Sequence, residues 1–220
     1  MTIHAHYSIH HQLLELAHLT IGKRQRHIKG ILLIIHQGCG LVQLGRHFYP
    51  LGAKQALFLP ADTLFAWHHF AGARVSWVEF SLRLTQGAQV GLVPDGELLT
   101  AAAQRLADSD KISDWHGPEG RLCRVLYDEL QRQSLIPLRH FCATAQQLLS
   151  TPDPTQLDAA QAKAFAAQFG ISASDFCSQY QVLRARQDLA RSQLNAQQLA
   201  QHGFSSFAQF EQACGYWQST

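Results

Sequence analysis

The sequence contains no apolar run long enough to cross a membrane, because a spanning helix needs about 20 predominantly apolar residues. Its most apolar run, Ile31 to Ile35, has only five residues. The first eleven residues are polar and rich in histidine, and they lack the basic, apolar and cleavage regions of a signal peptide. The sequence therefore predicts no membrane association and a cytoplasmic location.

Cysteine pairs with the C-x-x-C spacing are also missing, which argues against a redox motif or a zinc ribbon. The cysteines are odd in number and scattered, and no export signal accompanies them. We expect reduced thiols that serve as small buried apolar residues. They are Cys39, Cys123, Cys142, Cys177 and Cys214.

Motifs of catalysis are absent as well: there is no G-x-S-x-G, P-loop, H-E-x-x-H or G-x-G-x-x-G. Asp128 and Glu129 are adjacent on an expected helix and point in different directions. A metal-dependent cupin enzyme needs an H-x-H on a barrel strand, and the one H-x-H, His4 to His6, lies on the N-terminal arm. We expect no catalytic residue, no metal and no cofactor. A metal-dependent cupin enzyme is kept as the third functional hypothesis, after the two given at the end of this subsection.

Charge is scarce, since Asp, Glu, Lys and Arg make up only 15% of the chain. Residues 1–90 hold eight Lys and Arg against three acids, whereas residues 151–220 hold four against five. Nucleic-acid binding through the C-terminal part must therefore be electrostatically weak.

The first ninety residues are typical of short strands separated by turns. Ile31 to Ile35 is rich in β-branched residues, Leu57 to Leu59 is stopped by Pro60, and Arg74 to Phe80 alternates. Glycines lie at close spacing between these segments. Short strands with glycine turns favour a sandwich or a barrel.

Helical periodicity follows. Residues 97–107 and 119–133 repeat apolar positions with the i, i+3, i+4 spacing of an amphipathic helix, and a third helix is expected over 138–149. Two prolines in Thr151 to Pro154 then mark the clearest boundary of the chain. The fold class is α+β, with a barrel over 1–90, helical linkers over 91–150 and a helical bundle over 151–220.

The last part repeats one pattern: a helix, a glycine turn and a helix that a serine caps. The first copy runs from Ala162 to Ser172 and continues into Phe176 and Tyr180; Arg184 to Arg191 follows as a further helix. In the second copy, Gly203 opens the turn and Ser205 is expected to cap the last helix. Two such copies in tandem favour a double helix-turn-helix.

These segments resemble the AraC family of bacterial transcription regulators. Gly203 to Phe210 is similar to the second helix-turn-helix of that family, and Phe169 to Tyr180 resembles the first. The glycines at 38, 40, 45 and 52 with Tyr49, Pro60, the His68-His69 pair and Trp77 resemble its cupin-like sensor barrel, and Arg121 to Leu130 its connecting helix. The resemblance implies DNA binding tuned by a small-molecule effector or a partner.

The sequence also departs from the family pattern. Tyr180 runs almost directly into Arg184, where the family has a turn of about ten residues, and the second turn is one residue shorter. The expected recognition helices, Ser172 to Tyr180 and Ser205 to Trp217, carry no Lys or Arg. The basic turn and closing helix of the family have no counterpart up to Thr220.

The resemblance assigns candidate residues to three roles. The apolar face of residues 119–133, through Leu122, Val125, Leu126 and Leu130, is expected to form a homodimer contact. The expected DNA-contacting residues are Ser174, Ser178, Gln179, Arg184, Arg186, Ser206, Gln209 and Gln212. The expected ligand-binding residues, in the mouth of the barrel, are His36, Tyr49, Trp67, His68 and Trp77.

The function that follows is DNA-binding transcription regulation, responsive to a small ligand or partner. The alternative is a degenerate sensor or protein-interaction module that has lost specific DNA binding. The near-neutral C-terminal part supports this alternative.

Overall fold

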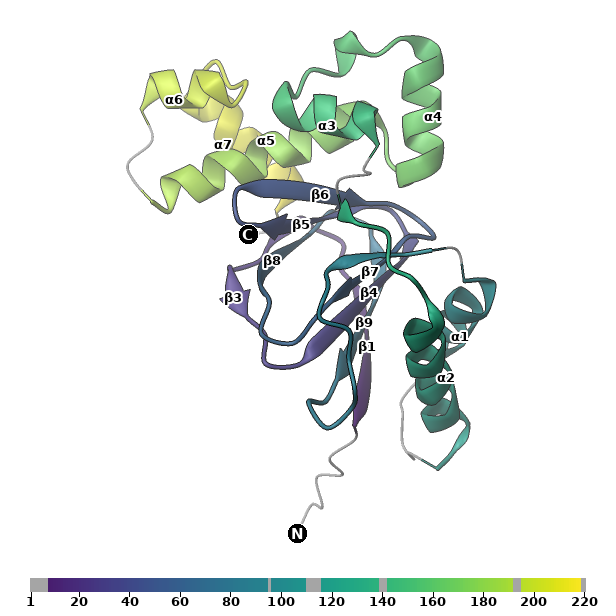
Figure 1. Ribbon diagram of the computed structural model, residues 1–220. Helices are drawn as coiled ribbons and strands as arrows, with labels where there is room; N and C mark the ends of the chain where they lie inside the picture. Colours follow the sequence, from purple (N-terminus) through teal and green to yellow (C-terminus); the bar gives the residue numbers. More distant parts are fainter. Residues whose placement is uncertain (1–7, 95, 110–115, 139–141, 192–194, 219–220) are drawn as a thin grey trace.

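Two antiparallel sheets form the first part of the chain (Figure 1). The computed structural model describes residues 8–94, 96–109, 116–138, 142–191 and 195–218. Sheet A has the strand order β1-β9-β4-β7-β10; sheet B has the order β2-β8-β5-β6, and β3 also pairs with β8. The strands are β1 (Ile9–Glu15), β2 (Thr20–Ile21), β3 (Gln25–Arg26), β4 (Gly30–Gln37), β5 (Gly40–Leu44), β6 (His47–Leu51), β7 (Ala56–Leu59), β8 (Leu64–His69), β9 (Arg74–Phe80) and β10 (Gly91–Val93).

The two sheets enclose an apolar core, and β4 shows how it is built. Ile31 and Leu33 lie in this core together with Trp67 of sheet B. Leu32 and Ile34 belong to a second apolar cluster, which β4 shares with helices outside the two sheets. Because both faces of β4 are buried, the strand is a continuous apolar run and does not alternate with polar residues.

Two helices cover the outer face of sheet A. They are α1 (Glu97–Ala107) and α2 (Pro118–Arg132), which confirms the helices predicted at 97–107 and 119–133 to within one residue. Leu126 and Leu130 of α2 are 0% and 6% exposed, and Leu122 and Val125 pack against the same cluster. The predicted dimer contact through this face is therefore wrong, because the face packs on the sheet of its own chain.

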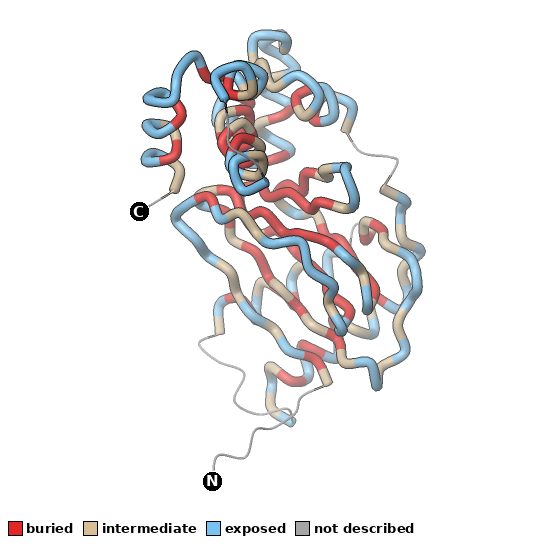
Figure 2. Tube along the Cα trace, turned by 90° about the vertical axis from the view of Figure 1, so that its left-hand side faces the viewer, coloured by how far each residue is buried: buried red, intermediate tan, exposed pale blue. Residues whose placement is uncertain are grey.

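The remaining helices lie across the outer face of sheet B (Figure 1). Leu41 of sheet B and Phe70, directly after β8, share one apolar cluster with Phe176 of α5. Figure 2 shows the buried residues continuing from the strands into the helices above them. The helices are α3 (Ala143–Ser150), the 3-10 turn η2 (Pro154–Gln156), α4 (Ala159–Phe169), α5 (Ala173–Leu189), α6 (Ala196–Gln201) and α7 (Phe207–Trp217).

The layers do not follow the expected boundaries at 90 and 150 strictly. Strand β10 extends sheet A to Val93 by pairing with β7. Helix α3 contributes Ala145 and Leu148 to the cluster formed by the later helices. Within the described ranges, no helix is both long and apolar enough to span a bilayer.

The Leu126→Ala variant should lower the free energy of unfolding by about 2–5 kcal/mol, because truncation of a buried leucine leaves a cavity. Leu98→Ala is the matched control, since Leu98 on α1 is 55% exposed. The control should change stability by no more than about 0.5 kcal/mol. Urea unfolding followed by circular dichroism measures both, and equal losses would contradict the packing of α2 on sheet A.

Candidate functional site

Two helix-turn-helix units make up most of the C-terminal helical part. In the first, α4 ends at Gly170, whose φ of 65° is left-handed, and Ser172 caps α5 by accepting a hydrogen bond from the amide of Asp175. In the second, Gly203 has a φ of 84° and Ser206 caps α7. Glycine adopts such positive φ values without strain. The duplicated pattern is confirmed, with the last cap at Ser206 where Ser205 was predicted.

The first unit differs from the prediction because α5 is one helix of 17 residues. A separate helix over 184–191 is therefore wrong. No glycine or proline interrupts Gln181 to Leu183, and Val182 and Leu183 are fully buried in the same cluster as Phe176. The segment Ser172 to Tyr180, which was expected to contact DNA, thus continues directly into the segment that connects the two units.

Two of the expected DNA-contacting side chains between Ser172 and Tyr180 already bind other parts of the chain. Ser174 is exposed, but the Ser178 hydroxyl accepts a 2.8 Å hydrogen bond from Trp217 Nε1. Gln179 was expected on the exposed face and is only 1% exposed. Its Oε1 accepts a 2.8 Å hydrogen bond from the amide of Ala71, in the turn between β8 and β9. In this arrangement Gln179 binds the barrel and has no surface to offer DNA.

In the second unit, two of the expected DNA-contacting side chains fix the start of α7 and a third is exposed. The Ser206 hydroxyl accepts a hydrogen bond from the Gln209 amide, and Gln209 Oε1 accepts bonds from the amide and hydroxyl of Ser205. Both side chains thus fix the start of α7. Gln212, one turn further on, is exposed. Arg186 is also exposed and donates through Nε to the side chain of Gln218 at 2.9 Å.

A polar contact joins sheet B to α5. His68 is fully buried, and its Nε2 lies 3.1 Å from Gln43 Oε1. The same oxygen accepts a 2.9 Å hydrogen bond from Gln187 Nε2 of α5. Since Gln43 Oε1 can only accept, His68 carries its proton on Nε2. Burial lowers the pKa of His68 to about 4, so the imidazole is neutral.

His68 therefore lies on the outer face of sheet B, whereas Trp67 belongs to the core between the sheets and the partly buried Trp77 packs against that core. Trp67 packs over Gly40, where a Cβ atom would meet the indole at 2.2 Å. Trp77 Nε1 donates to Glu79 Oε1 at 3.3 Å. These two rings fill the space between the sheets, as core residues do. Trp67 Nε1 and His69 Nδ1 are buried there without a hydrogen-bond partner among the described residues.

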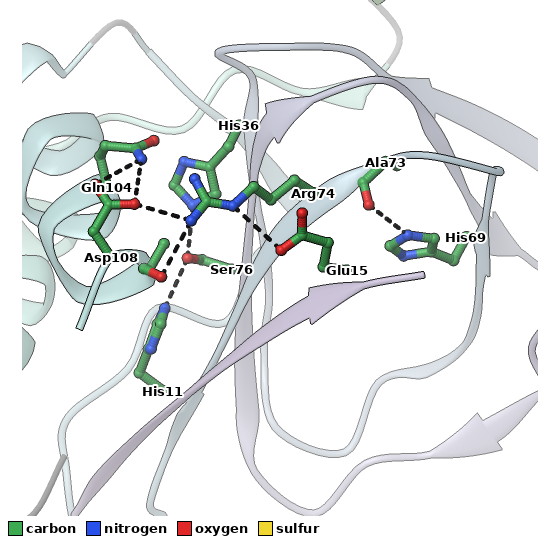
Figure 3. Close-up of polar contacts among 10 residues, drawn as sticks. His11, Glu15, His36, His69, Ala73, Arg74, Ser76, Gln104 and Asp108 are labelled. Carbon is green, nitrogen blue, oxygen red and sulfur yellow. Dashed lines mark hydrogen bonds and ion pairs between the residues drawn. The ribbon is translucent and has the colours of Figure 1, made fainter. Parts of the chain in front are cut away.

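His36 lies on the outer face of sheet A, in a polar cluster at the edge of α1 (Figure 3). The hydroxyl of the buried Ser76 is 2.7 Å from both His36 Nε2 and His11 Nε2. Beside them, Arg74 forms ion pairs with Asp108 and with Glu15. Burial lowers the pKa of both histidines, that of His11 to about 4.

This cluster borders a pocket of about 580 Å³, which His36 lines together with Lys54 and α1. Within the described part of the chain, no group of three or more His, Cys, Asp or Glu side chains is placed to hold a metal ion.

Tyr49 lines a different pocket, of about 460 Å³, at the junction of β6, α3 and α5. We call it the junction pocket. Arg184 lies over the ring of Phe48 at 5.5 Å from its centroid and donates to the hydroxyl of Tyr180 at 3.3 Å. The residues that line the junction pocket are Arg46, His47, Phe48, Tyr49, Leu138, Gln146, Leu149, Ser150, Tyr180 and Arg184.

The five expected ligand residues are thus not brought together. Trp67 and Trp77 lie in or against the core between the sheets, and His68 takes part in the contact with α5. His36 and Tyr49 line two different pockets outside that core. The junction pocket was missed, and it combines the ligand candidate Tyr49 with the DNA candidate Arg184. Its sequence signal is the Arg46 to Tyr49 segment, in which two basic residues precede two aromatic ones.

No family model and no curated protein matches the sequence. Solved structures of AraC-like activators match nearly the whole chain. ToxT from Vibrio cholerae is 10% identical with a TM-score of 0.40, covering 97% of this chain and 96% of that one. The AraC-like transcriptional activator CuxR is 12% identical with a TM-score of 0.43, covering 84% and 78%. A cupin superfamily protein from Desulfitobacterium hafniense is 15% identical with a TM-score of 0.33, covering 37% and 74%.

Acid should destabilise the fold through His68. Its pKa is about 4 in the folded chain and about 6.5 when unfolded, so above pH ~6.5 neither state binds a proton there. Between these values only the unfolded chain does, and stability falls as pH falls, by about 3 kcal/mol for this residue.

Urea unfolding at a series of pH values from 7 to 4 measures this loss. His68→Gln keeps a donor to Gln43 but does not titrate, so this variant should lose less stability than the unmodified chain. His18→Gln, at an exposed histidine, is the control and should keep the full loss. A fall of the same size in His68→Gln would show that His68 does not stay neutral in the folded chain.

Proposed function

We propose that this chain is a transcription regulator of the AraC type, with the two sheets as its sensor part and the two helix-turn-helix units as its DNA-binding part. The duplicated unit is the observation that supports this: twice a glycine with positive φ precedes a serine-capped helix. In helix-turn-helix proteins the second helix of a unit enters the major groove, and side chains near its start contact base edges.

The residues available for base contacts are few. Ser174 near the start of α5 and Gln212 in α7 are exposed, and glutamine suits the paired donor and acceptor of adenine. Two exposed cations lie nearby: Arg186 near the end of α5 and Arg191 just after it. A protein with so few phosphate contacts releases few counterions, so its affinity for DNA should depend only weakly on salt.

We further propose that the junction pocket holds the effector. Arg46 and Arg184 bring two positive charges to it, and none of its described lining residues is a carboxylate. Guanidinium groups bind carboxylates and phosphates well. Leu138 and Leu149 give the same pocket an apolar wall. An anion with an apolar body fits this combination, and its binding would act on β6 and α5 together.

A second candidate function is a sensor or protein-interaction module without specific DNA binding. The exposed side of α7 favours it, because Phe207 is 46% exposed and Glu211 is exposed and acidic. An acidic side chain on a recognition helix repels phosphate, and an exposed phenylalanine is more typical of a protein interface. The burial of Gln179 is consistent with the same function.

Fluorescence anisotropy of the purified chain on its own upstream DNA and on a scrambled duplex, across a salt series, separates the two functions. The regulator should bind the upstream DNA more tightly, with a shallow salt dependence. Gln212→Ala should weaken that binding by about 1–3 kcal/mol. Gln131→Ala, at an exposed glutamine on α2, is the control and should bind normally. Equal or absent binding to both duplexes would favour the protein-interaction module.

Decanoate is a suitable probe of the junction pocket, because it joins a carboxylate to an apolar chain. At about ten times its Kd it should stabilise the fold by about 1.4 kcal/mol, or raise the Tm by about 3–5 °C. Differential scanning fluorimetry at constant ionic strength should record a smaller shift for Arg184→Gln and an unchanged one for the exposed Arg105→Gln. Decanol, which lacks the carboxylate, should give a smaller shift than decanoate. A decanoate shift that is as large in Arg184→Gln as in the unmodified chain would contradict the role of the Arg184 charge.

A further inference from the structure

The pocket of about 580 Å³ beside His36 carries one charge of each sign. We call it the α1 pocket, and its volume is typical of small-molecule sites. Lys54, in the turn between β6 and β7, and Glu97, the first residue of α1, both line it. Both residues are exposed, and among the described residues neither side chain forms a hydrogen bond or an ion pair. The pocket thus offers two opposite charges that do not neutralise each other.

The backbone of Lys54 is fixed against β4. Its amide donates to the carbonyl of Ile35 at 2.8 Å, and the amide of Ile35 donates to the carbonyl of Gln55 at 2.9 Å. Lys54 has a φ of 67°, a left-handed conformation that is uncommon for a residue other than glycine. Residues held in this way gather at ligand sites, where the surrounding structure imposes the strained backbone. The turn therefore holds a lysine at the pocket although glycine would fit the backbone without strain.

The rest of the pocket wall is polar but neutral. Thr100 and Gln104 follow Glu97 on the same face of α1, at intervals of three and four residues, and both line the pocket. Gln104 is held in place because its Nε2 donates to both oxygens of the Asp108 carboxylate at 3.0 Å (Figure 3). His36 completes this wall, and burial lowers its pKa, so the imidazole adds no charge at neutral pH.

This arrangement of charges selects the kind of ligand. A simple anion would be attracted by Lys54 but repelled by Glu97, and a simple cation would meet the reverse. A zwitterion satisfies both, with its carboxylate on Lys54 and its ammonium group on Glu97, through charge-assisted hydrogen bonds. Free α-amino acids carry these two groups on one carbon atom. The neutral polar wall suits an amino acid whose own side chain is polar and uncharged.

We propose that the α1 pocket binds a free α-amino acid with a neutral polar side chain. Lys54 donates to its carboxylate, Glu97 accepts from its ammonium group, and Thr100 and Gln104 contact its side chain. The bound amino acid joins α1 to the turn between β6 and β7. The site goes beyond the proposed function, because it shares no lining residue with the junction pocket and none with the two helix-turn-helix units.

L-Glutamine is the probe, because analogues exist that lack each of its charges singly. Isothermal titration calorimetry on the full chain should record saturable binding of L-glutamine. 4-Carbamoylbutanoate is glutamine without its ammonium group, and 4-aminobutanamide is glutamine without its carboxylate. Each analogue should bind about 10-fold more weakly, since each loses one hydrogen-bonded charge pair. An analogue that binds as tightly as L-glutamine would overturn the proposal, because one of the two charges would then be unused.

Two variants match the two analogues. Lys54→Gln should weaken the binding of L-glutamine about 10-fold but should not weaken that of 4-aminobutanamide, which has no carboxylate to lose a partner. Glu97→Gln should have the same effect on L-glutamine and should not weaken the binding of 4-carbamoylbutanoate. Lys163→Gln and Glu211→Gln, at exposed residues of α4 and α7, are the matched controls and should bind L-glutamine normally. Circular dichroism confirms that each variant folds.

Three results separate the α1 pocket from the other proposed sites. L-Glutamine binding that both Lys54→Gln and Glu97→Gln leave unchanged would assign the ligand to another place and overturn the proposal. Absence of saturable binding up to about 10 mM for L-glutamine, L-asparagine, L-serine and L-threonine alike would overturn it as well. Arg184→Gln should bind L-glutamine normally, and a chain that binds L-glutamine but no DNA would keep this site and lose only the regulator.

Discussion

Helix α5 lies along the outer face of sheet B, held by ring contacts and by amide hydrogen bonds at both of its ends. Near its start, Phe176 packs against Phe70 at 5.4 Å between ring centroids, and Gln179 binds the amide of Ala71. Near its end, Gln187 binds Gln43. A buried amide that lost its partner would cost about 1–3 kcal/mol. These contacts therefore fix the helix in both position and register on the sheet.

The same packing limits what the helix-turn-helix units can present to solvent. Side chains that the first unit would need for base contact are used to bind the barrel and α7. The second unit keeps an exposed face, but that face is apolar and acidic beside Phe207 and Glu211. A regulator built in this way would depend on base contacts with little help from phosphate contacts, or it would act through proteins. We propose that the junction pocket, between sheet B and α5, is where a ligand alters this balance.

Local patterns in the sequence predicted the elements well, and tertiary relations poorly. The helix at 97–107 and the turn at Gly170 and Ser172 follow from periodicity and from capping chemistry, both of which are local. His68 and Gln179 were misplaced because each is buried by an element far away in the sequence, which no local pattern reveals. Trp67 was expected in a pocket and lies in the core, since an aromatic strand residue suits either environment.

The sequence also contains a signal that α5 is one continuous helix. Val182 and Leu183 extend the buried face of Phe176, and no glycine or proline separates them. The position of the last cap differed by a single residue because Ser205 and Ser206 are chemically equivalent, and only the backbone decides between them.

The unbroken α5 limits how the first helix-turn-helix unit can move on sheet B. A helix of 17 residues without an internal turn has no hinge, so the second helix of the first unit and the segment that connects the two units move as one rigid body. Any rearrangement of the first unit must then tilt or slide the whole helix over sheet B. Such a movement has to break the Gln179–Ala71 and Gln187–Gln43 hydrogen bonds together, because both bonds hold the same helix.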